Sequence, residues 1–240
     1  MMRIDVNMDY TETMGEKIPF VVRLKDMLSG KLGSLYDFNV MVEFEDDDAL
    51  KDPANMKRIE QLEQKLGTLQ LTKISGDKPR VQSVTRLVKE MNRTLNADSI
   101  EYYKIPDAQD MLTQLLFLYE ISDPDALFER MDENYKTTFI HIELAGYDAN
   151  QIVEDLDSAK NYGAQIFPDA KVSVVGEVVN YAEMNGKLVG GLLRSFGGSF
   201  VIIAIMMILA FGSIKAGLIG MIPNIAPVLL IGGVMGYSGM

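Results

Sequence analysis

His141 is the only histidine among 240 residues, and the chain contains no cysteine. Imidazole is the side chain that most often acts as a general base or binds a transition metal near neutral pH. His141 alternates with Ile140 and Ile142, an extended pattern that turns it toward the polar face of a strand. An isolated imidazole without a thiolate partner is far commoner at a surface than at a metal. We therefore predict that His141 is a surface residue and not a metal ligand.

Carboxylates and thioethers are the other groups in this sequence that could bind an ion. The acidic run at 45–48, Glu-Asp-Asp-Asp, could ligate calcium, but it lacks the spacing of a calcium-binding loop and is better interpreted as a solvated loop. Some of the 16 methionines could bind copper, although filling gaps in apolar packing is their commoner role. The sequence has no glycine-rich phosphate loop, nucleophile elbow or Glu/His zinc spacing. We expect no catalytic residue, cofactor or metal, and a protein that is not an enzyme.

Charge is distributed unevenly along the chain. All 34 acidic residues precede Arg194, as do 21 of the 23 basic residues, and the only charges from there onward are Arg194 and Lys215. Binding of nucleic acid requires clustered basic residues that displace counterions, so this acidic leading segment excludes nucleic acid as a partner. The excess of acidic residues in this segment also predicts a water-soluble domain.

The end of the chain has the opposite character. Residues 196–214 are nineteen in a row without a charge, which as a helix span about 28 Å, close to the apolar thickness of a bilayer. Arg194 and Lys215 bracket this stretch, where they can reach the headgroups. A second apolar stretch follows, so we predict membrane helices at 196–214 and 216–237 that form an antiparallel hairpin. The alternative is a buried hairpin of a water-soluble protein, but two stretches of this length are hard to bury in a chain of this size.

Two further features of the tail fit a membrane hairpin. Asn224 is the only strongly polar side chain of the second stretch, and it lies between Pro223 and Pro227, which neighbouring helices in a membrane can tolerate. Small residues recur at four-residue spacing, at 216/220 and 232/236, which suits close packing of helices in lipid.

The sequence of the leading segment predicts alternating strands and helices. A polar–apolar alternation predicts a strand, and apolar residues at three- and four-residue steps after Asp-Pro or Asp predict a helix. The pattern is strand, helix, strand, then a helical insertion at about 81–131, then strand, helix, strand. Two such units predict an α+β fold with one ferredoxin-like sheet and helices on one face. The predicted elements are a short helix after Pro19, strands at 34–44, 69–74, 136–145 and 171–176, and helices at 53–66 and 149–166.

One helix of the insertion, predicted at 106–121, is unusually apolar. Its apolar residues cover more than half of its circumference, whereas a helix on the surface of a lone domain needs only one apolar stripe. Leu116 and Phe117 are therefore candidates for contact with a hydrophobic substrate or with a neighbouring domain. Burial within the same domain is an equally good interpretation, because the insertion has two other helices that could cover them.

The amino-acid sequences of several segments resemble those of one family of membrane proteins. The stretch 174–240, which joins the domain to the hairpin, resembles the corresponding part of resistance–nodulation–division (RND) superfamily exporters. The closest likeness is to the hydrophobe exporters related to the mycobacterial large membrane proteins (MMPL). The resemblance covers nearly the whole chain and is carried by Ser-Ile-Lys-Ala-Gly-Leu-Ile at 213–219, Pro-Asn-Ile-Ala-Pro at 223–227, Lys-Leu-Gly-Ser-Leu-Tyr at 31–36, Glu-Tyr-Tyr-Lys-Ile-Pro at 101–106 and Leu-Leu-Phe-Leu-Tyr-Glu at 115–120.

This resemblance implies a role and a location. The family's proteins have twelve membrane helices in two similar halves, each half with a large extracytoplasmic domain. The chain would be a fragment of one: the second porter-like domain at 1–185, and a membrane domain at 186–240. It would supply part of the extracytoplasmic substrate path of a proton-driven, multi-pass inner-membrane exporter. Its partners would be the remainder of the same transporter, a hydrophobic or lipid substrate, and membrane lipids. The family's proton relay uses acidic residues in membrane helices, and none follows Glu183 here, so this chain alone is not expected to pump.

Two other functions compete with this interpretation. The first is a membrane-anchored binding or scaffold module with a cytoplasmic α/β domain. Lys187 and Arg194 lie on the domain side of the first span and Lys215 lies in the turn, so the positive-inside rule weakly favours it. The second is a lipid-modifying enzyme, which the lack of a nucleophile, metal cluster or paired base disfavours.

Overall fold

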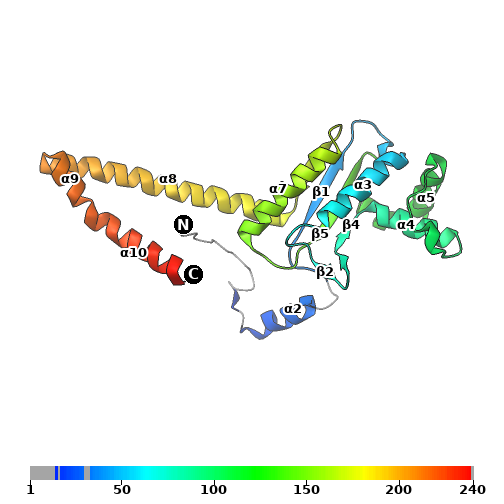
Figure 1. Cartoon of the computed structure of the whole chain (residues 1–240), viewed down its shortest axis with the longest axis horizontal. Helices are drawn as coiled ribbons and strands as arrows, with labels where there is room; N and C mark the ends of the chain where they lie inside the picture. The colour runs from blue at the N-terminus through cyan, green and yellow to red at the C-terminus, as the bar shows by residue number, and fades with distance from the viewer. Residues whose placement is uncertain (1–13, 16, 30–32, 239–240) are drawn as a thin grey trace. The chain divides into compact units, whose positions relative to one another are not determined.

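The computed structural model describes residues 14–15, 17–29 and 33–238. It confirms a chain of mixed helix and sheet, with an antiparallel sheet and long apolar helices at the C-terminal end (Figure 1). The chain divides into two compact units, one that extends to Asn180 and one that begins at Tyr181. The predicted short helix after Pro19 is α2 (Pro19–Ser29).

The first unit is built on a four-stranded sheet with the order β4-β5-β1-β6, in which every neighbouring pair is antiparallel. On the central strand β1, Val40 pairs with Ile140 of β5 on one side and with Val174 of β6 on the other. Helices α3 and α7 lie side by side on one face of the sheet (Figure 1). The elements are β1 (Asp37–Glu43), η1 (Ala49–Lys51), α3 (Pro53–Leu66), β4 (Val81–Gln82), β5 (Thr137–Glu143), α7 (Ala149–Ile166) and β6 (Lys171–Val175).

The core lies between the sheet and these two helices. Alternate residues of β1 and β5 are buried, as expected for strands with one covered face. The buried residues of α3 recur at three- and four-residue steps, which places them on one stripe. The core side chains include Phe38, Val40 and Val42 of β1, Ile140 and Ile142 of β5, Met56, Ile59, Leu62 and Leu66 of α3, and Ile152, Leu156 and Ala159 of α7.

Helices α3 and α7 begin where the sequence predicts, because each has an aspartate cap. The Asp52 carboxylate accepts a hydrogen bond from the Ala54 amide at 2.8 Å, and Pro53 fills the first helical position. The Asp148 carboxylate accepts from the amides of Asn150 and Gln151. The predicted bounds 53–66 and 149–166 are confirmed.

The predicted strand at 69–74 is wrong. Residues 69–71 form a bend and a turn, because the carboxylate of Asp155 on α7 accepts hydrogen bonds from the amides of Gln70 and Leu71, at 3.0 and 2.8 Å. Those amides are then unavailable to a strand partner. Only a single bridge, Thr72 to Leu144, joins the segment to the end of β5.

The place beside β5 is taken by β4 instead, where Val81 pairs with Ile142. The predicted helical insertion at 81–131 is therefore wrong at its start, because 81–82 belong to the sheet. A small hairpin, β2 (Ile74–Ser75) with β3 (Lys78–Pro79), precedes β4. The insertion between β4 and β5 holds α4 (Val84–Leu95), η2 (Ile100–Tyr102), α5 (Gln109–Ser122) and α6 (Pro124–Phe128).

The second unit consists of apolar helices whose bounds differ from the prediction. The predicted helix 196–214 is part of α8 (Glu177–Phe211), which begins earlier because no proline interrupts the sequence after Gly176. It ends before Gly212, which has a φ of 64°, a conformation that glycine adopts without steric cost. The predicted helix 216–237 is divided at Met221 into α9 (Ile214–Gly220) and α10 (Ile222–Ser238).

The division at Met221 and the reversal before α9 have local causes. Pro223 is the second residue of α10, a position where its missing N–H costs no hydrogen bond. At the reversal, α9 packs closely on the end of α8 (Figure 1). A Cβ on Gly217 would lie 2.7 Å from the Cα of Ile208, so only glycine allows this approach. A Cβ on Gly220, one of the small residues singled out in the sequence, would lie 2.6 Å from the terminal methyl of Met207, a flexible side chain that can move. The surroundings of 232 and 236 lie outside the described side chains.

Candidate functional site

Helix α5 of the insertion carries two apolar stripes on different sides. Leu112, Leu115 and Leu116 are buried and recur at three- and four-residue steps. Phe117 and Ile121, which are 57% and 67% exposed, lie one turn apart on another side. The exposed residues Phe117, Leu118 and Ile121 are named here the α5 apolar patch.

The domain itself holds the buried stripe of α5 in place. The Tyr135 hydroxyl donates a hydrogen bond to the Glu120 carboxylate of α5 at 2.6 Å, and Lys51 of η1 lies 4.0 Å from the centroid of the Tyr135 ring. Burial raises the pKa of Tyr135 well above its ordinary value, and its hydrogen bond to Glu120 raises it further. The phenol therefore stays protonated and keeps donating to Glu120 throughout the physiological range.

The two candidate residues of the sequence are thus in different environments. Leu116 is 1% exposed and belongs to the core of the insertion, whereas Phe117 points away from that core. Burial within the domain is confirmed for Leu116, whereas contact of Phe117 with a substrate or a neighbouring domain stays a prediction. The α5 apolar patch, and not the pair as a whole, is the surface that can meet a substrate or another domain.

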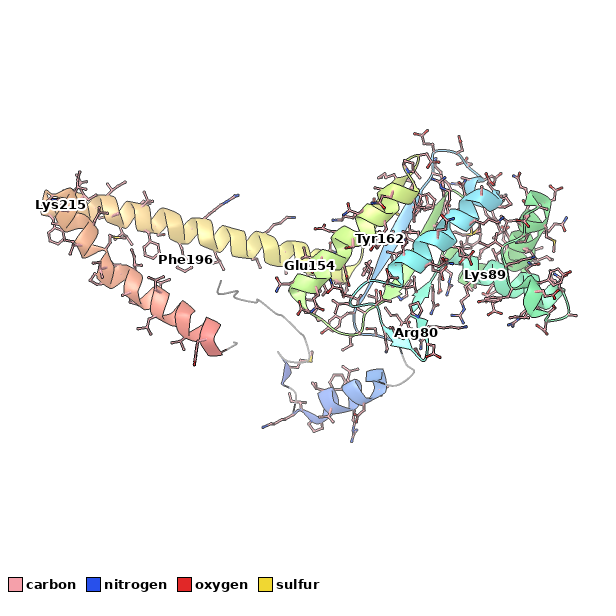
Figure 2. The ribbon with its side chains drawn as sticks, viewed as in Figure 1. Arg80, Lys89, Glu154, Tyr162, Phe196 and Lys215 are labelled. Atoms are coloured by element: carbon pink, nitrogen blue, oxygen red, sulfur yellow. The ribbon has the colours of Figure 1, made fainter. Side chains whose placement is uncertain are left out.

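A polar pocket of about 390 Å³ lies between α3, the β2–β3 hairpin and α4. Figure 2 labels Arg80 and Lys89 on two of its walls. Lys89 pairs with Glu60 at 2.7 Å, and the Glu63 carboxylate accepts hydrogen bonds from the hydroxyls of Ser83 and Thr85. These contacts tie α4 to α3, so the pocket wall positions the insertion.

The pocket was not predicted from the sequence. Its residues come from three segments, and no spacing along the chain marks Glu60 and Lys89, 29 positions apart, as partners. The hairpin that forms one wall turns at Gly76-Asp77, where Gly76 has a φ of 64°, a conformation that favours glycine.

The face of the sheet opposite α3 and α7 carries the single histidine. The Nδ1 atom of His141 lies 3.1 Å from the amide oxygen of Asn39 on the neighbouring strand. Together with Gln82, Arg130 and Phe139 they line a shallow pocket of about 330 Å³. His141 is half-buried and alternates with buried neighbours, as its pattern predicts.

Two carboxylates of the acidic run at 45–48 have basic neighbours. Asp48 pairs with Lys51 at 2.6 Å, and Asp47 lies 3.9 Å from Lys136. Within the described parts of the chain, no three His, Asp or Glu side chains come together in a group that could hold a metal ion.

Two helical stretches in the second unit are long and apolar enough to cross a membrane, Gly190–Phe211 and Ile214–Ile231. The first has 22 residues, which span about 33 Å, and none of its residues in the apolar window is buried. Figure 2 labels Phe196 within this stretch and Lys215 at the start of α9. Phe196, Met206 and Leu209 are among its exposed side chains.

Comparison of the sequence with protein-family models and with curated proteins finds no match.

Proposed function

We propose that this chain is part of a proton-driven RND-type membrane exporter of lipids or other hydrophobic compounds, related to the MMPL branch. The family assignment rests on the sequence resemblance. The observation that carries the membrane role is the exposed apolar stretch Gly190–Phe211. A stretch of that size exposed to water would aggregate, so lipid or protein must cover it. Its length, close to the apolar thickness of a bilayer, favours lipid.

The arrangement of the first unit supports a porter-like role. The strand order β4-β5-β1-β6, with α3 and α7 on one face, suits a ferredoxin-like sheet made of two βαβ units. The insertion joins these units and presents the α5 apolar patch. We assign this patch to contact with the hydrophobic substrate or with a neighbouring domain of the same transporter.

In this proposal, other parts of the transporter supply the acidic residues that take up protons. No Asp or Glu follows Glu183, so the acidic residues that take up protons belong to other membrane helices of the exporter. In this proposal the chain contributes part of the extracytoplasmic substrate path and two spans of a multi-pass inner-membrane protein.

A second function has one observation in its favour. Lys187 precedes the first apolar stretch, Arg194 lies near its N-terminal end and Lys215 follows it, which by the positive-inside rule favours a cytoplasmic α/β domain. The chain would then be a membrane-anchored binding or scaffold module. The orientation of the domain distinguishes the two functions.

We expect the α/β domain to face outward in cells that carry the intact protein. The Asp47→Cys protein should react with a membrane-impermeant maleimide before lysis, because Asp47 is exposed on the domain. The Ile214→Cys protein should react only after lysis, because Ile214 starts the helix beyond the first span. The reverse pattern of labelling would establish the cytoplasmic module and exclude the exporter path.

A further inference from the structure

Helix α2 carries an apolar stripe that is open to solvent. Phe20, Leu24 and Met27 are four and three positions apart, which places them on one side of this 11-residue helix. Phe20 is 62% exposed and Met27 is 55% exposed, and Leu24 is half-buried. By helical spacing, Val22 lies on the opposite side from the stripe. Val22 is itself 45% exposed, whereas the neighbouring Val21 is fully buried, so the helix is held by Val21 and presents the stripe to its surroundings.

The charges around this stripe differ from those of the rest of the domain. The sequence of α2 contains Arg23 and Lys25 against one acidic residue, Asp26, and the pair Glu16-Lys17 precedes it. From the start of the chain to Leu193, by contrast, 34 acidic residues face 21 basic ones. Arg23 is exposed and lies beside the stripe, next to Leu24. An arginine in this place can lay its aliphatic stem along an apolar surface while its guanidinium reaches anionic headgroups.

We propose that α2 lies in the headgroup layer of an anionic bilayer, with Phe20, Leu24 and Met27 inserted among the acyl chains. Apolar side chains flanked by cations fit a lipid surface, and an acidic domain needs such a local site to approach anionic lipid. A bilayer is also the surface that the exposed stretch Gly190–Phe211 requires. The inference rests on the proposed membrane insertion of α8 and is independent of what is transported. It gives the α/β domain a second attachment to the membrane, on its N-terminal side.

Tryptophan fluorescence in vesicles tests this inference, because the chain contains no tryptophan. Three single-tryptophan versions of the whole chain, Phe20→Trp, Val22→Trp and Ile203→Trp, are reconstituted into phosphatidylcholine–phosphatidylglycerol vesicles with or without brominated acyl chains. Bromine quenches an indole only at close range, so quenching reports contact with acyl chains. We expect quenching of about twofold or more for Phe20→Trp and Ile203→Trp, and little for Val22→Trp on the opposite side of α2. Adding Arg23→Gln to Phe20→Trp should reduce its quenching, because a headgroup contact is lost.

The outcomes separate this inference from the proposed function. If the indole of the Ile203→Trp chain is not quenched, α8 is not in lipid, and both proposals fail. If that indole is quenched but the indole of the Phe20→Trp chain is not, α8 spans the membrane and α2 does not touch it. A blue-shifted but unquenched Phe20→Trp emission would mean that protein covers the stripe, which also overturns the inference. Equal quenching of Phe20→Trp and Val22→Trp would contradict the proposed orientation of the helix.

Discussion

Replacing Asp155 by alanine is expected to lower the melting temperature of the α/β domain by about 10 °C, measured by tyrosine fluorescence of the purified chain. The buried Asp155 carboxylate accepts from the amides of Gln70 and Leu71, and alanine would leave both donors without it. Each hydrogen bond to a charged group contributes about 1.5–3 kcal/mol, so the expected loss for the two is about 3–6 kcal/mol. This substitution should also free the segment 69–74 from its turn conformation.

Asp157→Ala is the matched control for this experiment. Asp157 lies on the same helix two positions away, is exposed, and makes only a 4.0 Å ion pair with Lys160. Its replacement should change the melting temperature by no more than about 2 °C. A similar melting temperature for Asp155→Ala and Asp157→Ala would show that the two amides find other acceptors, and that Asp155 does not shape this segment.

The second large effect is expected at Leu116. Leu116→Ser removes a fully buried side chain from α5 and buries a hydroxyl, at a cost of about 3–5 kcal/mol. The melting temperature of the domain should therefore fall by about 10 °C. The adjacent change Phe117→Ser removes an exposed ring and should leave the melting temperature within about 2 °C.

The export activity of the intact transporter gives the complementary result. Phe117→Ser should reduce export although the domain remains stable, because the α5 apolar patch loses its largest side chain. Asp125→Ser, at an exposed position of α6 outside the patch, is the control and should leave export unchanged. Normal export by the Phe117→Ser protein would remove the patch from the substrate path, and a large fall in its melting temperature would make Phe117 part of the core.

Elements defined by local signals could be predicted from the sequence. Helices α3 and α7 have their caps, Asp52 and Asp148, within the same few residues that begin the helix, and their core stripes follow a regular spacing. The strand around Val40 can be predicted for the same reason, because the alternation of polar and apolar residues is a property of the segment itself. These elements supply much of the core between the sheet and its helices.

Features that depend on distant residues could not be predicted. The segment 69–74 has strand-like residues, but Asp155 lies 85 positions from Gln70 and still determines its conformation. On α5 the composition indicates excess apolar surface, yet only the tertiary fold decides that Leu116 faces inward and Phe117 outward. The charged pocket between α3 and α4 is likewise assembled from residues far apart in the chain.

The apolar tail has features of both kinds, some that the local sequence predicts and some that it does not. Absence of charge predicts the two long apolar stretches, since this property needs no partner. Their bounds depend on finer features, namely the φ of Gly212, the position of Pro223 and the close approach of Gly217 to α8. A charge pattern alone contains none of these.

Cysteine accessibility along α8 tests most directly whether the chain crosses a membrane. Single cysteines are placed one at a time from Met184 to Ile214 in the cysteine-free chain, and membranes are treated with a water-soluble maleimide. A span in lipid predicts one continuous unreactive block of about 20 residues within Gly190–Phe211, with reactive positions at both ends. Reactive positions that recur every three or four residues through this block would instead identify a helix packed on protein with one face in water, and would contradict the account.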